Sequence, residues 1–233
     1  MRFSRLILLL LLPAPFCVAG APPATRPSPL ATQPLLSSWF NVQTNLQTWS
    51  ADFIQTRTFK SLTQPLVATG QVWFAEPNRF RWELGRPPQT IAVRAPDDLL
   101  IVYPRLKRVE KFPLSGPARG QWRDALALLE AGFPRSEADL LSRFRLLSQT
   151  ISNSVCSLTL QPKSASARRL MPQIRIEFTT NTLELCATEL RFADGSSMRN
   201  DFHNGKLNPL LASNLFNPVI EAGYTVVAPM KEK

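Results

Sequence analysis

The sequence is poor in the residues on which most metal and nucleotide sites depend. Its 233 residues include one histidine, three cysteines and only nine glycines against 21 prolines. The single histidine, His203, leaves no histidine-rich metal site, and three cysteines cannot form a four-cysteine zinc site. The chain also lacks a Walker motif and a Gly-x-Gly-x-x-Gly loop. We therefore expect no cofactor, no ATP-driven activity and no dinucleotide chemistry.

Apolar and basic residues, in contrast, are plentiful. The hydrophobic fraction is 44%, with 14 Phe and five Trp, which is typical of a chain with a packed core. The formal net charge is +10, which favours anionic partners such as lipid head groups or acidic proteins. The basic residues are scattered, and an exported protein would not meet nucleic acid, so we expect no nucleic-acid partner.

The N-terminus has the features of an export signal. Arg2 and Arg5 precede an aliphatic run, residues 6–12, and small residues follow at 19–21. This pattern predicts a signal peptide over residues 1–20. Cys17 follows the bulky Phe16, whereas a lipoprotein signal has a small residue there, so we expect a soluble exported protein without a lipid anchor.

Two further segments follow the predicted signal. Residues 21–34 are rich in proline and predict a linker. Residues 35–233 contain no repeat and no second linker, so we expect one domain.

Helices and strands of this domain are predicted from periodicity. An apolar stripe from Leu35 to Trp49 predicts an amphipathic helix. Shorter helices are expected at 122–129 and 136–142, the latter with Ser136 and Asp139 as a capping pair. Period-two alternation predicts about eleven strands with short connections; they span 49–53, 66–74, 80–84, 91–93, 99–103, 106–112, 144–149, 155–161, 172–178, 183–192 and 198–202, with a further edge strand possible at 219–228.

These elements predict a mainly β fold: one large, antiparallel, curved sheet, or open incomplete β-barrel, covered by about three helices. Apolar residues facing the helices would either fill the interior or line a cavity for a lipid-like ligand, and alternation does not distinguish the two. The residues predicted to line the cavity are Trp39, Leu66, Val72, Phe74, Trp82, Ile91, Ile101 and Trp122.

Cys156 and Cys186 would remain after signal cleavage, and export favours a disulfide. If 155–161, 172–178 and 183–192 form a meander, the two cysteines lie on its outer strands, about 9–10 Å apart. A disulfide needs Cα atoms within about 7 Å, so the pair could be bridged only with another strand order.

A series of motifs in order resembles a known family. Residues 51–56 (Ala-Asp-Phe-Ile-Gln-Thr), 70–74 (Gly-Gln-Val-Trp-Phe) and 77–83 (Pro-Asn-Arg-Phe-Arg-Trp-Glu) are followed by 158–163 (Leu-Thr-Leu-Gln-Pro-Lys) and 216–218 (Phe-Asn-Pro). The set resembles the periplasmic outer-membrane lipoprotein carrier family, LolA, over about residues 35–220.

The resemblance implies an open β-barrel with a helical cover over an apolar cavity. It implies a monomeric periplasmic carrier that takes acylated lipoproteins from an inner-membrane lipoprotein-releasing ABC transporter to an outer-membrane receptor. The alternative is a divergent lipid-binding, glycolipid-binding or regulatory module of the same fold. An enzyme is not expected, because no Gly-x-Ser-x-Gly motif is present.

One position departs from the family pattern. Members typically have an arginine before the Pro of the Pro-x-x-Phe-x-Trp block, where it contacts the helical cover, and this chain has Glu76. The reversed charge cannot make the same bond, so Arg79 and Arg81 become candidates for the closing contact. Phe80 matches the family phenylalanine that contacts the transporter.

Overall fold

The structure is a computed structural model that describes residues 29–77, 79–94, 98–114, 132–218 and 220–227. The predicted signal peptide, the predicted helix at 122–129 and Trp122 lie outside these ranges. None of the described helices is long and apolar enough to cross a membrane.

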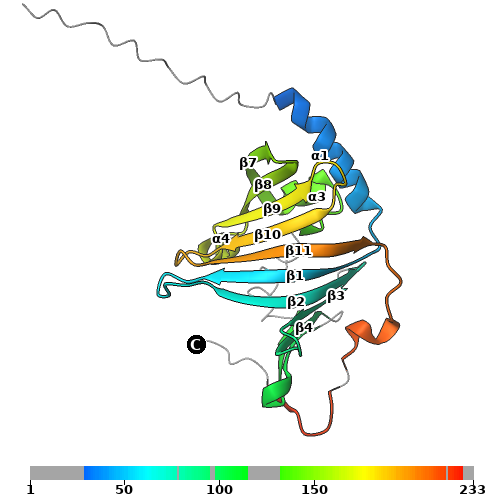
Figure 1. Ribbon diagram of the computed structural model, residues 1–233, viewed down its shortest axis with the longest axis vertical. Coiled ribbons are helices and arrows are strands. Elements are labelled where there is room, and N and C mark those ends of the chain that lie inside the picture. Colours follow the sequence, from blue (N-terminus) through cyan, green and yellow to red (C-terminus); the bar gives the residue numbers. More distant parts are fainter. Residues whose placement is uncertain (1–28, 78, 95–97, 115–131, 219, 228–233) are drawn as a thin grey trace, which may run out of the picture.

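Twelve strands form one curved sheet in the order β12-β6-β5-β4-β3-β2-β1-β11-β10-β9-β8-β7 (Figure 1). Because β12 and β7 are the two edges, the sheet is not closed, as the open-barrel prediction requires. Every neighbouring pair is antiparallel except β12 and β6, which are parallel. The strands are β1 (Thr48–Thr58), β2 (Leu66–Ala75), β3 (Arg79–Leu84), β4 (Thr90–Arg94), β5 (Asp98–Tyr103), β6 (Arg108–Pro113), β7 (Phe144–Ser152), β8 (Val155–Pro162), β9 (Gln173–Thr179), β10 (Leu185–Arg191), β11 (Ser197–Leu207) and β12 (Thr225–Val227).

The sheet consists of two meanders joined through the pairing of β1 with β11. Short connections favour antiparallel neighbours, so β1 to β6 and β7 to β11 each follow the chain in order. The join places Phe53 opposite Phe202 and Thr56 opposite Arg199. Residues about 150 positions apart in the sequence thereby become neighbours.

The described residues contain three α-helices: α1 (Pro29–Thr44), α3 (Glu137–Arg143) and α4 (Ala165–Leu170). Helix α3 confirms the capping prediction, since Ser136 Oγ accepts a hydrogen bond from the Asp139 amide at 3.1 Å. Helix α1 begins within the range expected to be linker and ends at Thr44, so Trp49 belongs to β1 and not to the helix. Helix α4 was not predicted.

The main core lies between the sheet and α1 and α3. Trp39 of α1 is fully buried and stacks on Phe178 of β9 with ring centroids 4.7 Å apart. Leu140 of α3 joins the same cluster. In Figure 1, α1 and α3 lie toward one end of β8–β11 and α4 lies at the other end. We call the sheet face that contacts α1 and α3 the inner face, and the opposite one the outer face.

The strand order separates the two cysteines. Cys156 lies on β8 and Cys186 on β10, and β9 runs between them. Both are free thiols, and burial raises the pKa of each. The meander geometry predicted from the sequence is therefore present.

Candidate functional site

Strand pairing builds two rows of side chains on the inner face of β2–β6. Val72 pairs with Trp82, Trp82 with Ala92, and Ala92 with Ile101. Directly opposed residues of antiparallel strands project to the same face, so these four form one row across the sheet. We call them the apolar row. Trp82, Ala92 and Ile101 are only partly buried, and the Trp82 ring lies 4.1 Å from that of Phe53.

The second row runs beside the first and is more deeply buried. It contains Phe80 of β3, Leu99 of β5 and Phe112 of β6, which form a cluster of their own. Arg94 lies in this row between Phe80 and Leu99, and burial lowers the pKa of its guanidinium. The two rows are therefore apolar across β2–β5 except for Arg94, and on β6 the apolar row ends at Glu110, which pairs with Ile101.

The predicted cavity residues do not all meet. Val72, Phe74, Trp82 and Ile101 lie on the inner face. Trp39 packs in the main core with no exposed surface. Alternation accounts for the face that these residues share, because each strand keeps its phase; their role in lining a lipid cavity stays a prediction.

Leu66 and Ile91 depart from the predicted arrangement. Leu66 has the inner-face phase but pairs with Arg57 at the far end of β2 and is 54% exposed. Ile91 pairs with Glu83 and Val102, which places it on the outer face. The prediction for Ile91 was wrong because β4 carries apolar residues on both faces: Ala92 lies on the inner face, whereas Ile91 and the fully buried Val93 lie on the outer face.

Ile91 instead lines a cavity of about 300 Å³ on the outer face. The C-terminal segment covers it with η3 (Ser213–Phe216) and the residues that follow. Arg81 also lines it, bonding Glu83 at 2.6 Å and the Leu215 carbonyl at 3.2 Å.

Arg79 lies on the same face, with its guanidinium 5.3 Å from the centre of the Phe216 ring. Among the described residues, Arg79 and Arg81 contact the C-terminal segment and not α1, α3 or α4, so neither makes the closing contact to these helices.

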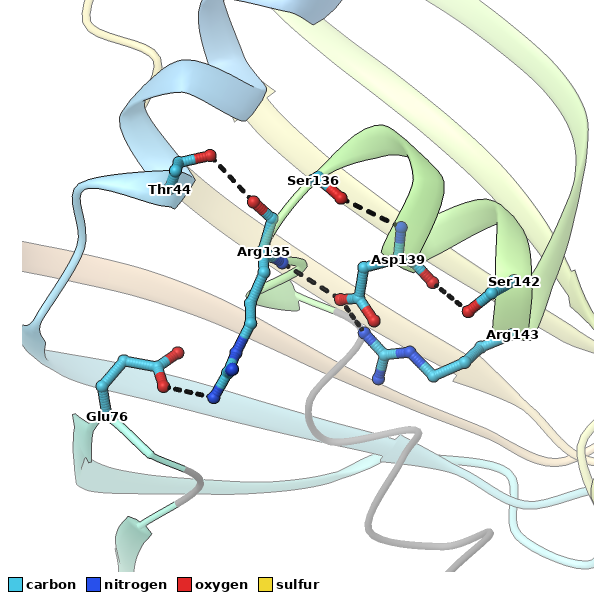
Figure 2. A network of polar contacts seen from close by, with 7 residues as sticks. All are labelled: Thr44, Glu76, Arg135, Ser136, Asp139, Ser142 and Arg143. Carbon is cyan, nitrogen blue, oxygen red and sulfur yellow. Dashed lines mark hydrogen bonds and ion pairs between the residues drawn. The ribbon is translucent and has the colours of Figure 1, made fainter.

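Glu76 contacts the helical cover through a residue that sequence reasoning missed. Glu76 Oε2 accepts from Arg135 Nη2 at 2.6 Å, just before α3 (Figure 2). Thr44 Oγ1, at the end of α1, donates to the Arg135 carbonyl at 2.8 Å, and the Arg135 amide donates to Asp139 Oδ2 at 3.1 Å. The Glu76–Arg135 pair thus joins the end of β2 to α1 and α3.

In this pair the acid is on the sheet and the base is on the cover. Both side chains keep solvent contact, with 24% and 59% of their surfaces exposed. An exposed ion pair contributes about 1 kcal/mol or less. The contact is therefore weak enough to open.

Phe80 is only 6% exposed and belongs to the second row. In this conformation its side chain offers almost no surface to a partner. Its role as a transporter contact stays a prediction.

The Phe-x-Gln motif of β1 has two separate functions in the packing. Phe53 lies in the main core. Gln55 is 5% exposed, and its Nε2 donates to Asn200 Oδ1 at 3.0 Å, while Asn200 Nδ2 donates to Thr188 Oγ1 at 3.2 Å. This buried polar ladder fixes the register of β1, β11 and β10, because a slip would leave its amides unpaired.

Comparison with solved structures gives distant likenesses at 9–16% identity. An uncharacterized conserved protein from Thermus thermophilus has 10% identity and a TM-score of 0.49, with 85% of this chain and 99% of that chain covered. A LolA superfamily protein from Nitrosomonas europaea has 11% identity and a TM-score of 0.41, with coverage of 80% and 97%. The MucA/MucB complex of Pseudomonas aeruginosa has 16% identity and a TM-score of 0.40, with coverage of 79% and 61%.

No curated protein matches the sequence. The family model described as outer membrane lipoprotein carrier protein LolA matches residues 44–219, which is most of the chain. Members of this family are periplasmic carrier or binding proteins. The mainly β fold, the open twelve-stranded sheet and this match agree, and the chain belongs to the LolA family.

Proposed function

We propose that the protein is a periplasmic carrier that shields lipoprotein acyl chains on the inner face of β2–β5 and moves them from the inner to the outer membrane. The observation that supports this most directly is the apolar row. Three of its four side chains, Trp82, Ala92 and Ile101, are only partly buried, although they lie beside a packed core that includes Val72. Partly buried apolar surface of this kind is where an acyl chain would gain most from contact.

The energetics favour a shallow apolar face over a deep sealed pocket. Each methylene removed from water contributes about 0.8 kcal/mol. The chains of a lipoprotein would together exceed the practical limit of non-covalent affinity, about −20 kcal/mol. A carrier that gained all of this free energy could not release its cargo. Partial shielding under a movable cover keeps the affinity low enough for release.

The Glu76–Arg135 pair would serve this release in our proposal. It is a weak contact between the sheet and the cover, so loading could break it at a small cost. Phe80 would become accessible to an inner-membrane ABC transporter only if the inner face opens. An outer-membrane receptor would complete the route.

The first experiment identifies the cargo. The exported protein is purified from its host's periplasm, and bound molecules are identified by mass spectrometry. Recovery of acylated proteins supports the carrier function. Recovery of free lipid or glycolipid without acylated protein contradicts lipoprotein transfer and supports a divergent lipid-binding role.

A matched pair of tryptophan variants tests the site itself. Trp82 lies in the apolar row, while Trp73 lies on the neighbouring strand and faces outward, opposite Arg81. We expect Trp82→Ala to lower binding of an acylated peptide about tenfold, because its large apolar surface is lost. Trp73→Ala should leave binding near the wild-type value. Equal losses in both variants would place the acyl site elsewhere.

One observation favours the second candidate function, a divergent lipid-binding or regulatory module. The contact between sheet and cover has reversed polarity through Glu76 and Arg135. A partner that recognises the family arginine would not recognise this chain. Absence of lipoprotein transfer from a family transporter, together with retained lipid binding, would favour this alternative.

A further inference from the structure

A second cavity lies at the opposite end of the strands from the Glu76–Arg135 pair. The Glu76 amide bonds the Gln47 carbonyl beside the start of β1, whereas the cavity opens beside Arg57 at the end of β1. At about 3.3 Å per residue, the strand separates the two places by roughly 30 Å. The cavity has a volume of about 390 Å³, within the range of ligand pockets.

Its walls come from three parts of the chain that the fold brings together. The end of β1, the end of α4 and the turn between β10 and β11 each contribute; the lining residues are Arg57, Phe59, Arg169, Leu170, Phe192, Ala193, Asp194, Ser196 and Ser197. In Figure 1 the β1–β2 hairpin, α4 and the β10–β11 turn lie at the same end of the sheet.

One side of this cavity is apolar and continuous with the main core. Phe59 and Leu170 contribute apolar surface, and Leu170 is 51% exposed. Phe192 is partly buried and packs against the main core. Met198, which pairs with Arg57, packs there too. An apolar tail in the cavity would therefore lie on the same hydrophobic layer that supports the sheet.

The other side is cationic. Arg57 and Arg169 line the cavity, and Lys60 lies against Gly195 in the β10–β11 turn. The single carboxylate, Asp194, accepts from the Ser196 amide at 2.8 Å and from its hydroxyl at 2.6 Å, and these bonds lower its pKa. The cations outnumber the acid, so the mouth attracts anions.

The two arginines also retain hydrogen-bonding capacity. Within the described part of the chain, Arg57 makes no ion pair or hydrogen bond, and Arg169 bonds only the Ala165 carbonyl, at 3.4 Å. By contrast, Arg199 on β11 is held by Glu177 and Asp201 at 2.8 Å each. Free guanidinium groups suit carboxylate and phosphate, which they bind with two parallel hydrogen bonds.

We propose that this cavity is a binding site for an anionic amphiphile, with its carboxylate or phosphate held by Arg57 and Arg169 and its apolar tail lying against Phe59, Leu170 and Phe192. The inference rests on the proposed lipid-binding function and specifies the charge of the head group. It holds equally for a fatty acid and for a lipid phosphate, which share this chemistry.

Isothermal titration calorimetry of the full chain tests the proposal with four probes kept below micelle formation: dodecanoate, dodecyl phosphate, dodecyltrimethylammonium and inorganic phosphate. We expect the two anionic amphiphiles to bind at least about tenfold more tightly than the cationic one. Arg57→Gln/Arg169→Gln should remove this preference. Arg105→Gln/Arg145→Gln, two exposed arginines away from the cavity, makes the same change in net charge and should preserve the preference.

A second comparison tests the apolar wall. Leu170→Gln should weaken dodecanoate several-fold and leave inorganic phosphate unchanged, because only the tail contacts Leu170. The matched control is Leu106→Gln, at a leucine that is 70% exposed on another part of the surface. Equal losses from both leucine variants would overturn the assignment of the tail.

The outcomes separate this inference from the proposed function. Tight binding of amphiphiles with no preference for anions, or equal losses in both double variants, overturns the head-group site and leaves lipid binding intact. Inorganic phosphate binding as tightly as dodecyl phosphate would show an anion site without a role for the tail. Failure to bind any amphiphile would overturn the head-group site and the proposed function together.

Discussion

The two halves of the sheet use the same alternation of residues but are covered differently. On β9, the inner-face residues Ile174, Ile176 and Phe178 are at most 1% exposed, because α1 and α3 cover that half. On β4 and β5, the inner-face residues Ala92 and Ile101 of the apolar row remain partly exposed, although Leu99 in the second row is buried. We call the first the packed half (β8–β11) and the second the open half (β3–β6).

The difference in burial assigns folding stability and ligand binding to different halves of the sheet. A fully packed core contributes stability but has no room for a ligand. Partly exposed apolar side chains contribute less to stability and can exchange water for an acyl chain. The packed half would therefore hold the fold while the open half carries the cargo.

The largest expected effect comes from truncating the packed half. Phe178→Ala removes the ring on which Trp39 stacks and leaves a cavity in a dense core. We expect a loss of about 3–5 kcal/mol in the free energy of unfolding, measured by urea denaturation. Ile101→Ala in the open half should lose about 1 kcal/mol and weaken binding of an acylated peptide. Equal losses of stability from both variants would end the distinction between the halves.

A second test uses the pH dependence of the free energy of unfolding, which should report on Glu177 in the packed half. Burial acts to raise the pKa of Glu177 on β9, but hydrogen bonds from Arg199 and Ser157, both at 2.8 Å, outweigh it and leave the pKa lowered. A lowered folded-state pKa gives stability above the ordinary glutamate pKa, about 4.3, which is lost as the pH falls through the folded value.

The variant Glu177→Gln should therefore cost about 1–2 kcal/mol at pH 7, and the difference from wild type should shrink at pH 3. The measurement is urea denaturation at several pH values. Glu137→Gln, at an exposed residue of α3, is the control. A constant difference between pH 7 and pH 3 would contradict the assignment.

The smallest effect is expected at the ion pair between the sheet and the helical cover. Glu76 ends the sheet side and Arg135 begins the cover, so Glu76→Arg and Arg135→Glu should each cost up to about 1 kcal/mol. The double variant restores opposite charges and should recover most of that loss. A double-mutant cycle in low salt measures the coupling, and additive losses would show that the pair contributes nothing.

Some features follow directly from local sequence. Ser136 and Asp139 cap α3 as predicted, because a capping pair acts within one turn. Alternation located the strands, and short connections dictated antiparallel neighbours. The separation of Cys156 and Cys186 by β9 also follows from chain order.

Other features depended on contacts across the fold. The face of Ile91 was missed because β4 is apolar on both faces, so its apolar residues do not reveal which face is inner, and α4 was missed because its six residues carry no clear periodicity. Arg135 could not be found, because nothing near residue 135 indicates that residue 76 lies beside it. The same holds for the cavity beside Arg57, whose walls come from three distant segments.

The amino-acid sequence alone determined the strands and the mainly β fold, since alternation and capping are properties of neighbouring residues, and the order of its motifs along the chain indicated the family. Only the tertiary structure decided which half of the sheet is packed, which residues face outward and which charge meets Glu76. Those properties depend on the pairing of β1 with β11 and on where the helices lie, and such long-range contacts have no local signature.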